Sequence, residues 1–315
     1  MHKLLLTGAN GFVGQHLIST LGDNYQVIGV VHNSDLRSTG NIKYESGNIL
    51  DRGFLEDLIR KYQPDSVLHL AAIAPTWTQD PENIFKINLI GTLNLYLALE
   101  AQKKQSGIDP KIIYVSSAEA YGKTTNPELI NESNPFFPAN YYGASKVAAD
   151  RLSYQMSQSA KLRIIIIRPF NHTGPGQNKG FFVPDMASQI VELENSDDNA
   201  QLMVGNLESV RDISDVRDIA AGYKAILETD TTPGEAYNLC SGRGTRMKDI
   251  LDILLSHAKK EIKIVEDPKR MRPSEVPITV GDNSKFKQLT GWEPKISLEQ
   301  TLEDTLEYWR SKISK

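Results

Sequence analysis

The sequence has few of the features that would place the chain in a secreted, membrane or nucleic-acid-binding class. It has a single cysteine, Cys240, so no disulfide can form within the chain, and this suits a reducing compartment. The opening MHKLLLTGAN has too short an apolar run for a signal peptide, and no later run approaches a membrane span. The net charge is −4 and the basic residues are scattered, which gives no reason to expect nucleic acid. We therefore expect a soluble, cytoplasmic protein that binds neither membranes nor nucleic acids.

A metal centre is not expected either, because no cluster of histidine and cysteine has metal-ligand spacing. What the first half does contain is an alternation of short β-branched runs with longer helical patterns. The candidate strands are KLLLTG, YQVIGVV, DSVLHLAA, KIIYVSS and LRIIIIRP. The candidate helices are Val13–Leu21, Phe54–Tyr62, Glu82–Ala101 and Tyr141–Ser157. Several strands are apolar on both faces, so the pattern predicts an α/β fold with a doubly wound parallel sheet of the Rossmann type.

After Pro169 the pattern loosens, and glycines and prolines crowd RPFNHTGPGQNKGFFVP, a loop of the kind that usually binds a ligand. A helix at Val216–Leu227, a strand at Ala236–Cys240 and a helix beginning near Thr245 follow. The last helix is predicted from an S-x-x-Q capping box and one apolar stripe. These features are formed by Ser297, Gln300, Leu298, Leu302, Leu306 and Trp309.

The segment TGANGFVG follows the opening strand and leads into a helix. Gly8, Gly11 and Gly14 are spaced three apart. Glycine permits a tight turn and close approach of the backbone to a pyrophosphate, whose charge then faces a helix N-terminus. A lone glycine pattern is weak, but the strand–loop–helix context favours dinucleotide binding over a purely structural turn.

The end of the second strand bears on the choice of coenzyme. A carboxylate there normally holds the ribose 2′-hydroxyl of NAD, but this chain has His32, Asn33 and Ser34, with Asp35 and Arg37 slightly later. The missing acid weakens an NAD-only hypothesis, and Arg37 or Ser34 could meet a 2′-phosphate. The sequence therefore favours NADPH, with use of NADH as well left open.

The segment NYYGASK places Tyr142 and Lys146 one helical turn apart on the same face. A free phenol has a pKa of about 10, and a nearby cation lowers it by favouring phenolate. Tyr142 could then protonate the oxygen of a carbonyl as hydride reaches its carbon. Tyr141 has no such partner, and we expect it to pack or to line the substrate. Ser117, at the end of IIYVSS, could stabilise the same oxygen.

TGANGFVG, VSSAEAYG and YYGASK, in this order and spacing, resemble the extended short-chain dehydrogenase/reductase family, whose members act on nucleotide sugars. The resemblance covers essentially the whole chain and implies Ser117, Tyr142 and Lys146 as the catalytic residues. It also implies that Asn88 supports the active site and that Asn48 lies at the adenine, where many members have aspartate. The residues expected at the cofactor are Gly8, Asn10, Gly11, Phe12, Val13, Gly14, His32, Asn33, Arg37, Asn48, Ile49, Leu70, Ala71, Ala72, Asn88, Tyr142 and Lys146.

RPFNHTGPGQ, GNLESVRDISDV, YNLCSG and DPKRMRPSEVP resemble one branch of that family, the GDP-4-dehydro-6-deoxy-D-mannose reductases that form GDP-D-rhamnose. The resemblance implies a GDP-sugar substrate, and an arginine fork suits phosphate oxygens while a carboxylate suits ribose hydroxyls. It also implies that residues 1–168 bind NAD(P), with segments near 213–240 and 277–290 returning to them, and that 169–315 mainly form a smaller α/β nucleotide-sugar-binding domain. The residues expected at the substrate are Ser117, Glu119, Asn171, Val183, Arg211, Arg272 and Glu275; His172 is an alternative contact.

Glu119 keeps a second reaction open, because GDP-mannose 4,6-dehydratases of the same family carry their catalytic glutamate at this place. Those relatives usually have threonine at the position of Ser117 and differ after FNH. The alternative is thus a dehydratase, or another epimerase or reductase of the family. A catalytically silent nucleotide sensor is disfavoured, since Tyr142 and Lys146 are both present. The sequence leaves open which face of the sugar receives hydride, so GDP-6-deoxy-D-talose is a second possible product.

Leu89–Leu99 is apolar nearly all round, so one side of this helix could face a second subunit rather than its own core. We expect a homodimer formed through this helix and the Tyr142 helix, largely because the family pairs in that way.

Overall fold

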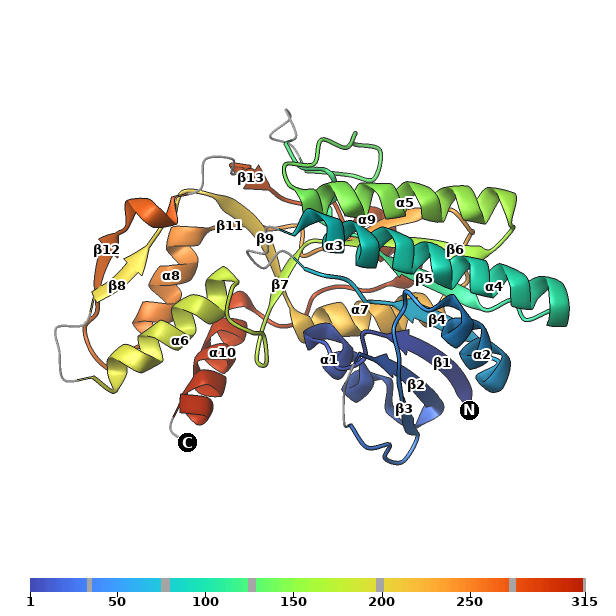
Figure 1. Cartoon of the computed structure of the whole chain (residues 1–315). Coiled ribbons are helices and arrows are strands. Elements are labelled where there is room, and N and C mark those ends of the chain that lie inside the picture. The colour runs from blue at the N-terminus through green and yellow to red at the C-terminus, as the bar shows by residue number, and fades with distance from the viewer. Residues whose placement is uncertain (33–35, 75–79, 124–128, 197–200, 272–275, 314–315) are drawn as a thin grey trace.

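The computed structural model describes residues 1–32, 36–74, 80–123, 129–196, 201–271 and 276–313. Seven parallel strands form its central sheet, in the order β10-β6-β5-β4-β1-β2-β3 (Figure 1). They are β1 (His2–Thr7), β2 (Tyr25–Val31), β3 (Ile42–Ser46), β4 (Ser66–His69), β5 (Lys111–Val115), β6 (Arg163–Pro169) and β10 (Ala236–Leu239). The chain moves outward from β1 to β3 and then restarts at β4 on the other side of β1. The predicted doubly wound α/β fold is therefore confirmed.

Helices cover both faces of this sheet, which explains why its strands are apolar on both sides. One face packs against α1 (Phe12–Leu21), α7 (Val216–Glu228) and α9 (Ser284–Thr290). The other packs against α2 (Arg52–Tyr62), α4 (Thr92–Ser106) and α5 (Tyr141–Ser159). Successive residues of β1 alternate between the two cores: Leu4 and Leu6 lie in the first, and Leu5 lies in the second.

A smaller lobe lies to one side of the large sheet, at the left of Figure 1. Its core is enclosed by α6 (Phe182–Glu194), α8 (Met247–Ser256) and α10 (Leu298–Ile313), with β8 (Gln201–Val204) paired to β12 (Lys263–Glu266). A second sheet joins this lobe to the first. It consists of β7 (Asn171–Thr173), β9 (Val210–Asp215), β11 (Gly244–Arg246) and β13 (Ile278–Thr279).

Most predicted elements of the first half match within a few residues, but three expectations need correction. The helix expected from near Thr245 begins at Met247, because Gly244–Arg246 pairs with β9 instead. The capping box is half formed: the Gln300 backbone N–H donates to Ser297 Oγ at 3.2 Å, but the Gln300 side chain donates to Asp304 at 2.8 Å. The loop after Pro169 contains the short strand β7.

The helix predicted at Glu82–Ala101 is a longer helical segment, Pro81–Ser106. It comprises α3 (Pro81–Phe85), a π-helical turn (Lys86–Gly91) and α4. By length and composition it could cross a membrane, but 44% of its apolar window is buried inside the structure. It packs on α2 and α5.

Asp215 ties the large sheet to the smaller lobe. Its carboxylate caps α7 by accepting from the Arg217 backbone N–H at 2.7 Å, and it also accepts from the Arg217 side chain and from Thr301 of α10. The side chain of Asp215 is completely buried, so its loss would leave these donors without their acceptor.

We expect Asp215→Ala to lower the free energy of unfolding by about 3 kcal/mol, the sum of a lost cap and a lost charged hydrogen bond. Urea denaturation measures this. The control is Asp252→Ala, which removes an exposed ion pair with Lys248 and should change stability by less than about 0.5 kcal/mol. Equal losses in the two variants would contradict the role assigned to Asp215.

Candidate functional site

Several predicted site residues, among them Gly8, Ala71 and Ser117, follow β1, β4 and β5, which end next to the point where the strand order reverses. This edge is where ligands bind in open parallel sheets. Helix α1 starts there: Gly11 is its N-cap without a side-chain cap, and no acidic residue lies in its first turn. Its first N–H groups are therefore available to an anion.

Two glycines of the β1–α1 turn are required by close contacts. Gly8 has φ +72°, and a Cβ there would lie 2.9 Å from the Ala71 backbone nitrogen. A Cβ on Gly14 would lie 2.5 Å from the Gly8 carbonyl oxygen. The turn is thus folded tightly against Leu70 and Ala71, and a glycine turn before a helix N-terminus fits a dinucleotide pyrophosphate.

The residues expected at the adenosine end lie on two neighbouring strand ends. His32 and Arg37 are exposed after β2, while Asn33 lies outside the described residues. Asn48 is exposed, and its side-chain oxygen accepts from the Leu50 N–H at 2.9 Å. Ile49 is buried and packs on Gly91. Their contacts with a cofactor remain predictions.

A buried chain of hydrogen bonds runs beneath the glycine turn, and the sequence did not reveal it. Thr7 Oγ1 accepts from the Ala71 N–H at 3.2 Å and lies 2.6 Å from His69 Nδ1. His69 Nε2 lies 3.0 Å from Thr92 Oγ1, which donates to the Asn88 carbonyl oxygen. Burial lowers the pKa of His69 to about 3. The ring is therefore neutral: Nδ1 accepts from Thr7 and Nε2 donates to Thr92.

Asn88 lies in the π-helical turn, a distortion that is frequent at functional sites. Its side chain exchanges two hydrogen bonds with the backbone of Ile73 and donates to Ser145 Oγ at 3.0 Å. Ser145 Oγ in turn donates to the Tyr142 carbonyl oxygen at 2.7 Å. Asn88 therefore links the loop after β4 to the first turn of α5, and its support of the active site stays a prediction.

Ser117, Tyr142 and Lys146 come together as predicted, but their ionisation differs from the expectation. Burial raises the pKa of Tyr142 to about 12, the nearby Ser117 hydroxyl partly offsets this, and the Glu119 charge adds to it. The expected lowering by Lys146 is wrong for this structure, because the Lys146 Nζ donates to the Val115 carbonyl oxygen at 2.7 Å and lies 5.9 Å from the centre of the Tyr142 ring.

Lys146 itself is unusual, since only 4% of it is exposed. Burial lowers the pKa of Lys146 to about 7, and the nearby charge of Asp150 partly offsets this. The ring of Tyr114 on β5 lies 5.3 Å from its Nζ. At neutral pH this lysine is poised between its charged and neutral forms, whereas Tyr142 stays protonated.

Glu119 adjoins this pair and is held by a residue that the sequence reasoning did not single out. Asn140 Oδ1 caps α5 by accepting from the Gly143 N–H at 2.7 Å, and Asn140 Nδ2 donates to Glu119 Oε2 at 3.0 Å. An asparagine just before a helical pattern is a capping signal and could have been noticed. Tyr141 is 62% exposed, so it does not pack in the core, and the alternative that it lines the substrate stays a prediction.

The residues expected at the substrate divide into three groups. Asn171 and Arg211 lie on the paired strands β7 and β9, and the Arg211 Nη1 donates to the carbonyl oxygens of Val210 and Pro277. Val183 is buried in the core of the smaller lobe, so its substrate contact stays a prediction. Arg272 and Glu275 lie outside the described residues.

Two further observations complete the site. His172 stacks on Phe12, with ring centres 6.3 Å apart, and its Nδ1 lies 2.9 Å from the Phe170 carbonyl oxygen. Asp212, next to Arg211, is fully buried and accepts from the N–H groups of Ser241, Gly242 and Gly281.

In the part of the chain that the structure describes, no group of three histidine, cysteine, aspartate or glutamate residues could hold a metal ion.

Comparison with known proteins identifies relatives over the whole chain. A family model described as GDP-mannose 4,6 dehydratase matches residues 5–305. The chain is 34% identical to the GDP-6-deoxy-D-mannose reductase of Pseudomonas aeruginosa, covering 99% of this chain and 98% of that one. It is 28% identical to the GDP-6-deoxy-D-talose 4-dehydrogenase of Aggregatibacter actinomycetemcomitans, over 92% and 91% of the two chains.

Solved structures agree. RMD from Pseudomonas aeruginosa complexed with NADPH superposes with a TM-score of 0.83 at 32% identity, over 99% of this chain and 100% of that one. UDP-glucuronic acid 4-epimerase from Bacillus cereus, in complex with UDP-glucuronic acid and NAD, gives 0.87 at 25% identity, over 98% and 99%. Because the family match spans nearly the full length, the chain belongs to the GDP-mannose 4,6-dehydratase family of extended short-chain dehydrogenases/reductases.

Proposed function

We propose that this protein is an oxidoreductase that reduces the C4 keto group of GDP-4-dehydro-6-deoxy-D-mannose to give GDP-D-rhamnose. The observation that carries the proposal is the Tyr142 phenol, kept protonated by burial beside the Ser117 hydroxyl, with the buried Lys146 one turn away on α5. The full-length similarity to a GDP-6-deoxy-D-mannose reductase supports the choice of substrate. NADPH, or alternatively NADH, supplies hydride when bound.

The chain's own residues handle the proton and the charge. Ser117 and Tyr142 hold the ketone oxygen by hydrogen bonds, which orients the carbonyl and stabilises the negative charge that develops on it. Tyr142 gives its proton to that oxygen, and a phenol whose pKa is raised to about 12 is fully protonated beforehand. We propose that the Lys146 ammonium, which does not lower the pKa of Tyr142 in the resting structure, counters the negative charge on that oxygen only once the phenolate has formed.

We also propose roles for the surrounding residues. The N-terminus of α1 would hold the cofactor pyrophosphate, and Arg37 would meet a 2′-phosphate, which favours NADPH. Asn171, Arg211, Arg272 and Glu275 would hold the GDP-sugar. On this basis residues 1–168 are mainly the NAD(P)-binding domain and 169–315 mainly the domain for the nucleotide sugar, and the enzyme works in the cytoplasm.

Glu119 supports a second candidate, GDP-mannose 4,6-dehydratase. Its carboxylate is close enough to raise the pKa of Tyr142, so a base is present beside the proton donor. Such an enzyme would remove hydride from the sugar and return it, so the coenzyme would not be consumed.

The two candidates differ in their coenzyme balance, and one assay separates them. With GDP-4-dehydro-6-deoxy-D-mannose and NADPH, we expect one equivalent of coenzyme to be oxidised per sugar reduced, followed by absorbance at 340 nm. Chromatography against GDP-D-rhamnose and GDP-6-deoxy-D-talose standards identifies the product. Conversion of GDP-mannose without net consumption of coenzyme would instead establish the dehydratase.

The adjacent tyrosines provide a matched pair of variants. We expect Tyr142→Phe to lower kcat by about 100-fold or more, since general acid catalysis contributes that much, while NADPH still binds. Tyr141→Phe, at an exposed position one residue away, should keep kcat within about twofold because it leaves the proton donor in place. Near-normal turnover by Tyr142→Phe would remove the proton-donor assignment.

The lowered pKa of Lys146 predicts an alkaline limit to the reduction. As pH rises through about 7, Lys146 loses its charge, and the phenolate left by proton transfer loses its stabilisation. We therefore expect kcat/KM to decline above about pH 7, whereas the pKa of Tyr142, about 12, lies beyond the measured range. A pH–rate profile from pH 5.5 to 9.5 with a circular dichroism control tests this, and a rate still at its maximum at pH 9 would contradict it.

We further propose a homodimer formed through α4 and α5. Ile90, Leu93 and Leu97 lie along one side of the helical segment; Ile90 is 43% exposed and the two leucines are only partly buried. Tyr154 of the neighbouring α5 is also exposed. An apolar stripe of this kind is typical of a subunit interface.

Size-exclusion chromatography with light scattering tests the dimer. The wild-type protein should show twice the chain mass of 35.1 kDa. Leu97→Glu should give the single mass, because two carboxylates would be buried at the interface without partners. Ser106→Glu, at an exposed position on the opposite side of α4, should remain dimeric. A wild-type monomer, or a dimeric Leu97→Glu, would exclude this interface.

A further inference from the structure

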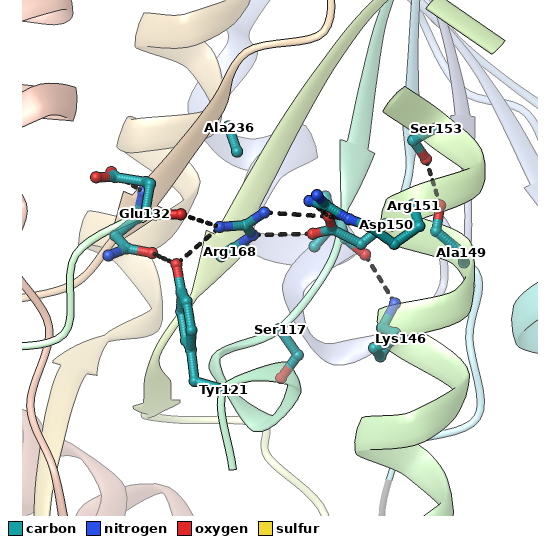
Figure 2. Close-up of polar contacts among 12 residues, drawn as sticks. Ser117, Tyr121, Glu132, Lys146, Ala149, Asp150, Arg151, Ser153, Arg168 and Ala236 are labelled. Carbon is teal, nitrogen blue, oxygen red and sulfur yellow. Dashed lines mark hydrogen bonds and ion pairs between the residues drawn. The ribbon is translucent and has the colours of Figure 1, made fainter. Parts of the chain in front are cut away.

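Arg168 is a buried guanidinium that lies behind the proposed reaction centre rather than in it. It belongs to β6, and only 2% of it is exposed. Its Nε and Nη2 donate to the two carboxylate oxygens of Asp150 at 2.9 and 3.1 Å. Its Nη1 donates to the Tyr121 hydroxyl at 2.9 Å and to the Glu132 carbonyl oxygen at 3.1 Å. Figure 2 shows Arg168 between Asp150 and Tyr121.

The partners of Arg168 belong to the elements that carry the proton donor and its serine. Asp150 lies on α5, one turn beyond Lys146 and two beyond Tyr142. Tyr121 follows the short 3-10 turn Ala118–Ala120, which Ser117 caps by accepting from the Glu119 N–H. One guanidinium thus connects the α5 helix to the Ser117 turn across β6.

Further contacts of Tyr121 and of the Arg168 guanidinium make this connection rigid. The Tyr121 hydroxyl donates to Asn238 Oδ1 of β10 at 2.7 Å, and Asn238 donates to the Ile130 carbonyl oxygen at 2.8 Å. The guanidinium carbon lies 4.7 Å from the centre of the Phe136 ring and 5.3 Å from that of Tyr121. With four N–H groups engaged and two aromatic rings against it, Arg168 has little freedom to move.

We propose that Arg168 is a positioning residue for proton transfer: through Asp150 and Tyr121 it sets the geometry of the Ser117–Tyr142 pair. This inference rests on the proposed function. The planar fork of arginine is needed because it meets a carboxylate with two parallel hydrogen bonds while still reaching Tyr121. A lysine at this position would retain the charge but could not keep all four contacts.

Stability alone does not account for this arrangement. Replacing a buried ion pair with apolar residues is often neutral or stabilising, because both charges must be removed from water. Displacement of a catalytic group by about 1 Å, in contrast, can cost about 100-fold in rate. The proposal therefore predicts a loss in kcat that exceeds any loss in binding.

The experiment compares Arg168→Lys with Arg310→Lys, a matched change far from the reaction centre. Arg310 of α10 is 13% exposed and donates to Glu194 and to the His257 carbonyl oxygen, so it is also a largely buried fork. For each variant, kcat, KM, the Kd for NADPH and urea stability are measured. We expect Arg168→Lys to lower kcat about 10- to 100-fold with KM and Kd within about twofold, and Arg310→Lys to lose stability only.

Tyr121→Phe is a second, milder variant that removes only the hydroxyl through which Arg168 reaches the Ser117 turn. It should lower kcat several-fold with unchanged Kd for NADPH. If Arg168→Lys keeps kcat within twofold, or loses NADPH binding in the same proportion, the positioning role is excluded. The positioning role is also excluded if Arg310→Lys lowers kcat as much as Arg168→Lys does.

Failure of the proposed function gives a different result. In that case the wild-type protein itself does not reduce GDP-4-dehydro-6-deoxy-D-mannose. The role of Arg168 is then tested without substrate, by the ¹³Cζ NMR signal of Tyr142. This signal is assigned as the one that is missing in Tyr142→Phe. Arg168→Lys should shift this signal because the position of Tyr142 relative to Ser117 changes, and Arg310→Lys should not. No shift in Arg168→Lys would overturn the proposal.

Discussion

The proposed reaction centre depends on a carboxylate–guanidinium pair that contacts no solvent. Asp150 and Arg168 are 0% and 2% exposed in their side chains, so Arg168 would impose a desolvation cost of several kcal/mol if it lost Asp150. The same carboxylate is the nearby negative charge that partly maintains the ammonium form of Lys146. One buried anion therefore interacts with three cations: Arg168 on β6, Arg151 next to it on α5, and Lys146, the proposed partner of the phenolate. Packing with apolar residues could hold α5 against β6 but could not supply the negative charge near Lys146.

The parallel sheet explains how residues far apart in the chain reach this pair. Strands β1, β4, β5 and β6 end at the same edge, and their following segments carry Gly8, Ala71, Ser117 and Asn171. Two hydrogen-bond networks then join these segments. The neutral His69 joins the β1 and β4 ends to the π-helical turn, and Arg168 joins α5 to the Ser117 turn. The fold provides proximity, and these buried polar groups fix the orientation of the segments that carry the proposed proton donor.

The sequence predicted what depends on local spacing and missed what depends on burial. The i, i+4 pair Tyr142 and Lys146, the glycine turn and the large sheet follow from periodicity and turn chemistry, and the structure has them. The direction of the Tyr142 pKa was wrong because spacing shows a neighbouring cation but not the loss of water around the phenol, which has the larger effect. The strand β7 has only three residues, too few for a pattern. In the sequence, Arg168 is part of an apolar candidate strand, and only the tertiary structure shows its hydrogen-bond partners.

Glu119 shows why family membership leaves the reaction undecided between reduction and dehydration. Both chemistries use the same proton donor, so Ser117, Tyr142 and Lys146 do not distinguish them. Dehydration also needs a base that can take a proton from the sugar, and a carboxylate serves best when its oxygens are free. In this structure Asn140 donates to Glu119 Oε2 while its own oxygen caps α5, so the helix that carries Tyr142 also restrains the carboxylate. A serine could cap the helix equally well but lacks the amide N–H that makes the second contact. Asparagine at this cap therefore favours one role for Glu119 over another. It favours a carboxylate that alters the electrostatic surroundings of Tyr142 over a carboxylate that acts as a base.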